Sequence, residues 1–208
     1  MYSVKEIFYT LQGEGAQSGR PAVFLRFAGC NLWNGKEADR KNATCNFCDT
    51  DFVGTNGTHG GKYDAKKLAR KIFELWSSSS GKPFVVCTGG EPLLQLDEEL
   101  IFEIHAYDFE VAVETNGTIE LPKHLDWICM SPKPNTEIKV TSGNELKFVF
   151  PQADFSPELF ERLKFDYFFI QPMDGPDIAT NLKAAVEFCL EHPQWRLSMQ
   201  THKLLGIR

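Results

Sequence analysis

The sequence predicts an α/β protein built as an open, partial (β/α) barrel of mainly parallel strands. Three observations predict this fold: strand and helix patterns alternate along the chain, several strands are apolar on both faces, and polar residues recur at strand ends. Repeated strand–helix–strand units place parallel strands inside and helices outside, and strands buried on both faces form continuous apolar runs. Four helix patterns are too few for a complete eight-unit barrel, so we expect an incomplete one.

The individual elements follow from their apolar spacing. Strands are predicted at Lys5–Thr10, Ala22–Phe27, Phe84–Thr88, Glu110–Thr115, Trp127–Ser131, Leu146–Phe150, Phe168–Gln171 and Arg196–Met199. Helices are predicted at Ala65–Trp76, Leu96–Ala106, Pro157–Leu163 and Ile178–Glu191. The first helix has the clearest apolar stripe, and Asp64 is placed to cap its N-terminus. The serine-rich patch Ser77–Gly81 is predicted to be a linker between elements.

Length and charge narrow the possible functions. A chain of 208 residues suits a single domain spanning residues 1–208. The formal net charge of −6 argues against a broad nucleic-acid surface, which needs excess lysine and arginine. The charged N-terminus lacks the apolar stretch of a signal peptide, and the apolar runs are too short to span a membrane. We therefore expect a cytoplasmic protein whose six cysteines are metal ligands or core residues rather than disulfides.

Three clustered cysteines are the strongest chemical signal. Fourteen residues separate Cys30 from Cys45, and two residues separate Cys45 from Cys48. Three thiolates leave one iron of a [4Fe–4S] cluster without a protein ligand, and such an iron can bind a cofactor. The alternative is a structural zinc site, which needs four ligands, with His59 as the fourth. The other three cysteines lie in apolar patterns typical of core packing: Cys87, Cys129 and Cys189.

A second motif favours the cluster. Thr88-Gly89-Gly90-Glu91-Pro92 stands at a strand end, where two glycines allow close approach of a ligand and Glu91 can accept hydrogen bonds from an ammonium group. Placed after three clustered cysteines, it resembles the cofactor amino-group motif of the radical S-adenosylmethionine (SAM) superfamily. Glu114-Thr115-Asn116-Gly117, at the next strand end, strengthens the resemblance.

The resemblance extends along nearly the whole chain to the 7-carboxy-7-deazaguanine synthase family, which serves queuosine and deazapurine biosynthesis. It rests on the joint order of Thr10–Gly15, Phe24–Leu32, Cys48–Asp51, Ser131–Lys133 and Gln171–Asp174. The resemblance implies conversion of 6-carboxy-5,6,7,8-tetrahydropterin to 7-carboxy-7-deazaguanine with loss of ammonia. The reduced cluster would cleave SAM to a 5′-deoxyadenosyl radical, so no side chain is expected to act as general acid or base. The family also implies Mg²⁺, a homodimer and a flavodoxin- or ferredoxin-like electron donor.

The same resemblance implies the site residues. Cys30, Cys45 and Cys48 would bind the cluster, and Thr50 would bind Mg²⁺. The SAM contacts would be Phe47, Cys48, Asp49, Gly90, Glu91, Glu114, Ser131, Pro132, Lys133, Gln171, Pro172, Met173 and Asp174. The pterin contacts would be Leu11, Gln12, Gly13, Glu14, Arg26, Thr88, His202 and Arg208.

The chain departs from the pattern in two respects, of which one is its last residue, Arg208, where related sequences often end in proline. The other is the spacing of the first two cysteines. Radical SAM proteins usually have three residues between the first two cysteines, whereas a subgroup of this family has an insertion like the present fourteen-residue spacing. The inserted stretch from Asn34 to Asn42 is charged and is expected to be a surface loop that leaves the cluster geometry intact. A glycyl-radical activating enzyme would share the cluster and the Gly-Gly-Glu-Pro motif, and a zinc-stabilised binding module would need neither SAM nor iron.

Overall fold

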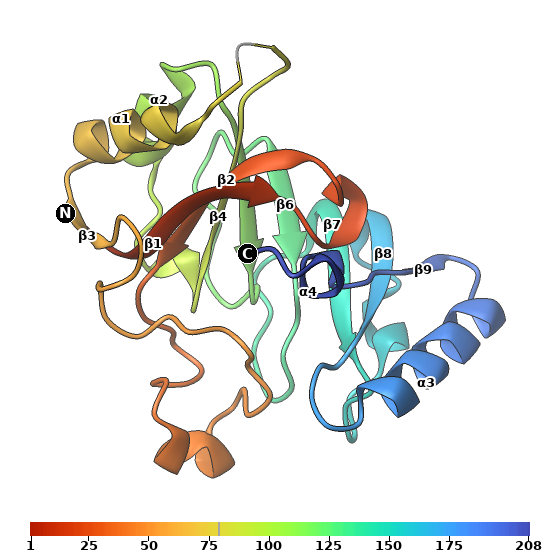
Figure 1. The fold of residues 1–208 in the computed structure, drawn as a ribbon. Coiled ribbons are helices and arrows are strands. Elements are labelled where there is room, and N and C mark those ends of the chain that lie inside the picture. Colours follow the sequence, from red (N-terminus) through yellow and green to blue (C-terminus); the bar gives the residue numbers. More distant parts are fainter. Residues whose placement is uncertain (79) are drawn as a thin grey trace.

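One nine-stranded sheet forms the centre of the molecule (Figure 1). The computed structural model describes residues 1–78 and 80–208, so Ser79 of the predicted Ser77–Gly81 linker lies outside the described residues. The strand order is β3-β1-β2-β4-β5-β6-β7-β8-β9, with β3 and β9 at the two edges. β2 and β4 to β9 pair in parallel, whereas β1 is antiparallel to both β2 and β3. The expected open, mainly parallel arrangement is confirmed.

The element bounds are as follows. The strands are β1 (Tyr2–Leu11), β2 (Pro21–Phe27), β3 (Gly61–Tyr63), β4 (Phe84–Gly89), β5 (Glu110–Thr115), β6 (Trp127–Met130), β7 (Ser142–Phe150), β8 (Lys164–Pro172) and β9 (Trp195–Leu197). The α-helices are α1 (Ala65–Leu75), α2 (Glu98–His105), α3 (Ile178–Glu191) and α4 (Thr201–Leu205). Short 3₁₀ turns are η1 (Gly15–Gln17), η2 (Glu37–Asn42), η3 (Pro92–Leu94) and η4 (Pro157–Phe160).

The predicted strands and most predicted helices are confirmed, with small shifts at their ends. Asp64 caps α1 as expected, accepting a hydrogen bond from the Lys67 backbone amide at 2.9 Å. The predicted helix Pro157–Leu163 is wrong, because only the 3₁₀ turn η4 forms before the chain turns into β8. The Leu163 amide donates to the Phe160 carbonyl, three residues back, and the Lys164 amide already donates to the Thr141 carbonyl at the start of the β7–β8 pairing.

The two faces of each central strand have different partners. Val23, Leu25, Val85 and Cys87 belong to the apolar cluster that packs beneath α1 and α2. On the other face a smaller apolar cluster forms, which we call the inner cluster. Its members are Ala22, Phe24, Phe84, Val86, Ala112 and Trp127. α1 and α2 lie over one part of the sheet, and α3 lies beside β8 and β9 at the other end (Figure 1).

This alternation determines where polar side chains can gather. Because side chains along a strand alternate between faces, Arg26 follows Phe24 on the inner face, Thr88 follows Val86, and Glu114 follows Ala112. The inner face is therefore apolar at its centre and polar at the carboxyl ends of the strands. Parallel sheets bind ligands at that end. No helix among residues 1–78 and 80–208 is long and apolar enough to cross a membrane.

Candidate active site

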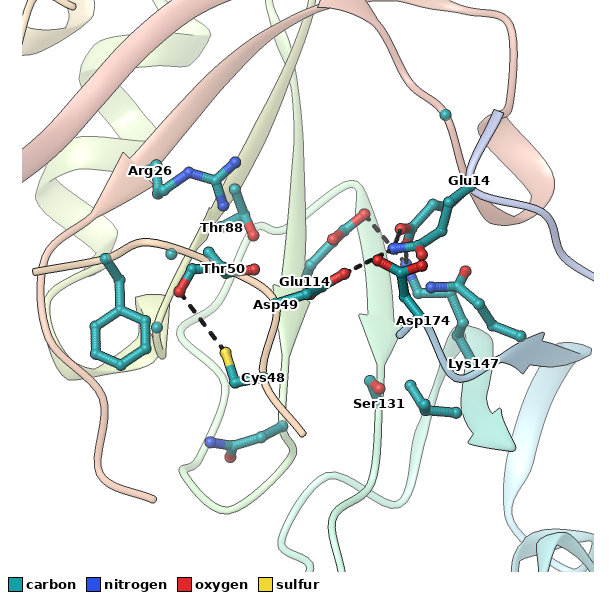
Figure 2. Close-up of a pocket in the computed structure, with 18 of the residues that line it drawn as sticks. Glu14, Arg26, Cys48, Asp49, Thr50, Thr88, Glu114, Ser131, Lys147 and Asp174 are labelled. Atoms are coloured by element: carbon teal, nitrogen blue, oxygen red, sulfur yellow. Dashed lines mark hydrogen bonds and ion pairs between the residues drawn. The ribbon is translucent and has the colours of Figure 1, made fainter. Parts of the chain in front are cut away.

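A pocket of about 360 Å³ opens at the carboxyl ends of the parallel strands (Figure 2). It unites segments that lie far apart in the sequence, as the strand-end argument predicted. The sequence-predicted residues that line it are Leu11, Gln12, Gly13, Glu14, Arg26, Cys30, Cys45, Phe47, Cys48, Asp49, Thr50, Thr88, Gly90, Glu114, Ser131, Lys133, Gln171, Pro172, Met173, Asp174, His202 and Arg208.

Two predicted site residues, Glu91 and Pro132, are buried and do not line the pocket. The Glu91 carboxylate accepts hydrogen bonds from the Leu93 amide at 3.0 Å, the Thr115 hydroxyl at 2.8 Å and the Asn116 amide at 2.8 Å. Burial raises the pKa of Glu91, and these hydrogen bonds oppose the rise. In this arrangement Glu91 joins the ends of β4 and β5, rather than facing the pocket as an ammonium acceptor.

The two glycines before Glu91 are required by the neighbouring chain. A Cβ on Gly89 would meet the Phe27 carbonyl, and a Cβ on Gly90 would meet the Gly29 carbonyl and the Cys30 Cβ. The Glu91 amide donates to the Gly29 carbonyl at 3.0 Å. The motif therefore packs directly against the segment that carries the first clustered cysteine.

Replacing Gly90 with alanine is expected to displace the Gly29–Cys30 backbone, because neither neighbour can yield as a flexible side chain would. Iron content after anaerobic reconstitution should fall well below that of the unmodified protein. Gly19→Ala is the control, since Gly19 has a φ of +86° with no atom near the added Cβ, so it strains the backbone without a clash. A fully loaded cluster in Gly90→Ala would contradict the packing argument.

The three clustered cysteines line the same pocket. A hydrogen bond between the Cys45 and Cys48 thiols lowers the pKa of Cys48 to about 6 and raises the pKa of Cys45. Burial raises the pKa of Cys30. Within the described part of the chain, no three histidine, cysteine, aspartate or glutamate side chains converge closely enough to hold a single metal ion. The three thiols line one pocket, as the ligands of a shared cluster would.

His59, the alternative fourth zinc ligand, lies elsewhere. It does not line the pocket, and its carbonyl accepts a hydrogen bond from the Tyr63 hydroxyl at 2.8 Å. The structure therefore does not bring His59 to the three cysteines, and the zinc interpretation loses its fourth ligand.

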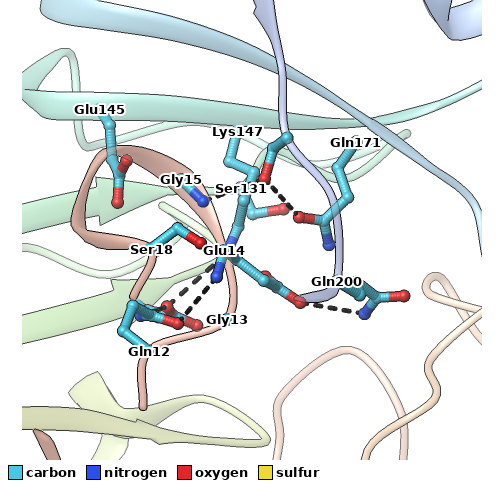
Figure 3. Close-up of polar contacts among 12 residues, drawn as sticks. Gln12, Gly13, Glu14, Gly15, Ser18, Ser131, Glu145, Lys147, Gln171 and Gln200 are labelled. Carbon is cyan, nitrogen blue, oxygen red and sulfur yellow. Dashed lines mark hydrogen bonds and ion pairs between the residues drawn. The ribbon is translucent and has the colours of Figure 1, made fainter. Parts of the chain in front are cut away.

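A buried lysine that was not predicted as a site residue lies between two carboxylates of the pocket wall (Figure 3). Lys147, on β7, forms an ion pair with Glu14 and lies 3.6 Å from Glu114. The Gln12 side chain donates to Glu114 at 2.8 Å, and the Gln200 side chain donates to Glu14 at 2.9 Å. Two carboxylates from distant segments thus share one ammonium group.

The charges in this group support one another. Burial alone would lower the pKa of Lys147, but the charges of Glu114 and Glu14 outweigh it and raise the pKa well above its usual value. Burial likewise opposes ionisation of Glu14, yet Lys147 and Gln200 lower its pKa. The signal for Lys147 was present in the sequence, as a lysine within the apolar run Leu146–Phe150. A buried charge of that kind requires a partner.

Two arginines approach one carboxylate at the opposite wall. Arg26 donates through Nε to Glu6 at 2.9 Å, and Arg208 donates through Nη2 to the same carboxylate at 2.8 Å. The Thr10 hydroxyl donates to the Arg208 carbonyl at 2.9 Å. Arg26 pairs in register with Thr88, and Figure 2 shows the two side chains next to each other. Glu6 was not predicted as a site residue, although it lines the pocket.

The C-terminal segment crosses the pocket mouth. As expected, Gln200 and His202 lie at the rim, but the helix α4 that presents them was not predicted. Lys203 bridges Asp49 at 2.6 Å and Asp174 at 2.5 Å. The Thr201 amide donates to the Gly13 carbonyl at 2.9 Å. The last helix therefore connects three of the segments predicted to bind ligands.

The three cysteines predicted as core residues differ in their surroundings. Cys129 is buried, as expected, but it also lines the pocket. Cys87 is fully buried in the cluster beneath α1 and α2, and Cys189 packs at the edge of the apolar cluster under α3. The core prediction is thus confirmed for Cys87, whereas Cys129 separates the core from the pocket.

Comparison with known proteins identifies the family. Residues 42–156 match the model of the radical SAM superfamily. The 7-carboxy-7-deazaguanine synthase of Bradyrhizobium diazoefficiens is 62% identical over 208 residues, covering 100% of this chain and 99% of that protein. The chain belongs to the 7-carboxy-7-deazaguanine synthase family.

Further relatives agree along the full length. The Bordetella pertussis 7-carboxy-7-deazaguanine synthase is 61% identical over 207 residues, covering 99% of each chain. The crystal structure of QueE from Escherichia coli superimposes with a TM-score of 0.70 at 27% identity, covering 95% of this chain and 93% of that chain. Family membership confirms the resemblance drawn from the motifs and implies a [4Fe–4S] cluster and SAM for this chain.

Proposed function

We propose that this chain converts 6-carboxy-5,6,7,8-tetrahydropterin to 7-carboxy-7-deazaguanine with release of ammonia, as a radical SAM lyase. The observation that carries the proposal is the 62% identity over the full chain to a protein named for that product. The pocket supports it, because segments from both ends of the chain supply candidate contacts to one cavity.

The chain has groups suited to the cluster and to SAM. Cys30, Cys45 and Cys48 would hold the cluster, leaving one iron for the amino and carboxylate groups of SAM. When bound, the reduced cluster and SAM supply the one-electron chemistry that starts the rearrangement. The remaining SAM contacts would be Phe47, Asp49, Gly90, Glu114, Ser131, Lys133, Gln171, Pro172, Met173 and Asp174, with Glu91 and Pro132 supporting the wall from behind.

The pterin would lie against the opposite wall. Arg26 has the planar guanidinium that pairs with a carboxylate, and its Nε bond to Glu6 orients it toward Thr88. Glu14, held ionised by Lys147, suits the amino and amide edge of the pterin. Leu11, Gln12, Gly13, His202 and Arg208 would complete the contact. These groups bind and orient the substrate and exclude water, and none is needed as a general acid or base.

Thr50 would contribute to a Mg²⁺ site shared with the substrate. It lines the pocket next to Cys48, whose thiol donates to the Thr50 carbonyl at 3.9 Å (Figure 2). Mg²⁺ prefers oxygen ligands and takes few of them from protein in such sites.

Thr50→Val, which removes only the hydroxyl, is expected to weaken the dependence of turnover on Mg²⁺ while the absorption spectrum of the cluster stays unchanged. Titration of initial rate against Mg²⁺ concentration measures the effect. Thr118→Val is the control, because Thr118 does not line the pocket. An unaltered Mg²⁺ titration in Thr50→Val would remove Thr50 from the site.

The proposed chemistry also requires partners and a compartment. Free thiols that bind iron need reducing surroundings, which a cytoplasmic location provides. We propose a flavodoxin- or ferredoxin-like protein as the electron donor, and a homodimer as the assembly. Analytical ultracentrifugation of the reconstituted protein tests the assembly, and a sedimentation coefficient of a monomer would refute it.

The function itself is tested by anaerobic incubation with reductant, SAM, Mg²⁺ and 6-carboxy-5,6,7,8-tetrahydropterin. Mass spectrometry should show 7-carboxy-7-deazaguanine formed in a reconstituted sample and absent without SAM. SAM cleavage without conversion of the pterin would retain the radical SAM assignment and refute the substrate.

A further inference from the structure

The insertion between Cys30 and Cys45 lies at the surface, as expected, and it also contacts the cysteine loop. In Figure 1 it is the orange segment with a short turn that projects from the sheet. This turn is η2, and it carries Arg40. The Arg40 Nη1 donates to the carbonyl of Asn46 at 3.1 Å and to the carbonyl of Cys48 at 3.0 Å. Both carbonyls belong to the loop that presents the Cys45 and Cys48 thiols.

Two further groups, Glu37 and Trp33, hold the guanidinium in place. Its Nε donates to both oxygens of Glu37, at 2.8 and 2.9 Å. Its Cζ lies 4.1 Å from the centre of the Trp33 ring, a cation–π distance. Trp33 is buried, packs edge-on against Phe52 and donates through its indole nitrogen to the Lys36 carbonyl at 3.2 Å. The ring therefore provides a rigid support for the arginine.

The chemistry of this contact is specific to arginine. A planar guanidinium with five donors can face a ring, a carboxylate and two carbonyls at once, whereas a lysine ammonium cannot occupy that geometry. The Glu37 side chain is 77% exposed, so this ion pair alone contributes little stability. The contacts of consequence are the two charge-assisted hydrogen bonds to the cysteine loop and the stacking on Trp33.

We propose that Arg40 is a positioning residue for the iron–sulfur cluster, holding the Cys45–Cys48 loop in its binding conformation. The inference rests on the proposed ligation by Cys30, Cys45 and Cys48, and it assigns to the insertion the task of supporting that loop. Arg40 also places a positive charge at the backbone of the loop that carries Cys45 and Cys48. Net charge and hydrogen bonding around a cluster set its reduction potential, so this charge favours the reduced, more negative cluster.

The test compares Arg40→Met, which keeps the apolar stem, with Arg40→Lys, which keeps the charge but loses the planar fork. Loss of absorbance under an iron chelator should be about tenfold faster in Arg40→Met, because two charged hydrogen bonds to the loop are gone. Arg40→Lys should lose absorbance nearly as fast as Arg40→Met, because the lysine ammonium cannot make both hydrogen bonds to the loop. The midpoint potential of the cluster, measured by redox titration with electron paramagnetic resonance, should fall in Arg40→Met and move less in Arg40→Lys.

Arg70→Met is the matched control, since Arg70 pairs with Glu74 on the exposed side of α1, away from the cluster loop. Far-ultraviolet circular dichroism and thermal unfolding of the apoproteins should match for all three variants and the unmodified chain. Wild-type chelator resistance and potential in Arg40→Met would overturn the proposal, as would full rescue of retention by lysine. An iron cluster that survives Cys45→Ala would instead refute the underlying ligation.

Discussion

Replacing Cys45 with alanine is expected to abolish the iron–sulfur cluster and, with it, all turnover. Cys45 is the most buried of the three clustered cysteines, and its thiol is hydrogen-bonded to Cys48 in the pocket wall. Cys30 and Cys48 would be left as two ligands for a group that needs three. The other cysteine and the histidine that line the pocket are Cys129, on β6, and His202, on α4. Iron and acid-labile sulfide, measured per chain after anaerobic reconstitution, should fall to background.

Cys189→Ala is the control for that experiment. Cys189 lies on α3 and packs at the edge of a separate apolar cluster, so its loss removes a thiol without touching the pocket. This variant should keep the full complement of iron and its brown colour. Iron bound in normal amount by Cys45→Ala, or lost from Cys189→Ala, would show that the ligands have been assigned incorrectly.

Replacing Lys147 with methionine is expected to destabilise the protein by about 3–5 kcal/mol, because breaking a buried ion pair by removing one partner leaves buried charge uncompensated. Glu14 would lose the ammonium group that it contacts, and Glu114 would lose its nearest cation. Turnover should also fall steeply, since both carboxylates lie in the pocket. Urea unfolding monitored by fluorescence measures the stability, and Lys183→Met on the exposed side of α3 should change it by less than about 0.5 kcal/mol.

The pH dependence of this effect has a definite sign. In the unmodified protein the pKa of Glu14 lies below its usual value, so its stabilising charge is present above the unfolded-state pKa of about 4.3 and is lost as the pH falls through the folded-state pKa. In Lys147→Met, burial without the ammonium group raises that pKa, and the folded state then favours the protonated acid. The deficit in stability should therefore shrink as the pH is lowered from 7 to 4. A deficit that is constant over this range would contradict the ion-pair explanation, and Glu14→Gln added to Lys147→Met should recover part of the loss at pH 7.

The sequence predicted the fold well where apolar periodicity was long. β5 and α3 have the predicted bounds, and α1 differs by one residue at its end. β3 was missed because three residues of the pattern Gly-Lys-Tyr carry no alternation, and they are extended only through pairing with β1. α4 was missed for a similar reason, since its position depends on Lys203 reaching Asp49 and Asp174.

The motifs predicted which residues line the pocket better than they predicted which groups those residues contact. Resemblance indicated residues that the structure gathers around one pocket, but it gave no indication that Glu91 faces inward toward Asn116. The family resemblance predicted Arg26 as a site residue but did not include Lys147 or Glu6, which lie outside the matched motifs. Arg40 was not predictable, because its contacts with Cys48 depend on how the insertion folds back. Contacts within an irregular loop of that kind leave no periodic signal in a sequence.

Side chains at the ends of the central strands face the core and the pocket alternately, so substitutions at neighbouring positions should have different effects. In β2, Leu25 faces the helices and is fully buried, whereas Arg26 beside it faces the pocket. In β4 the same relation holds between Cys87 and Thr88. Adjacent positions at these strand ends thus have different tasks, one in the core and the next in the pocket. A saturation library at these four positions should give two kinds of inactive variant. A chaperone or a lower growth temperature should restore activity to variants at Leu25 and Cys87, and should not restore it to variants at Arg26 and Thr88. New substrate preferences can accordingly be sought at pocket-facing residues of the strand ends, such as Arg26 and Thr88, whereas Phe84 and Val86 on the same face are buried in the inner cluster.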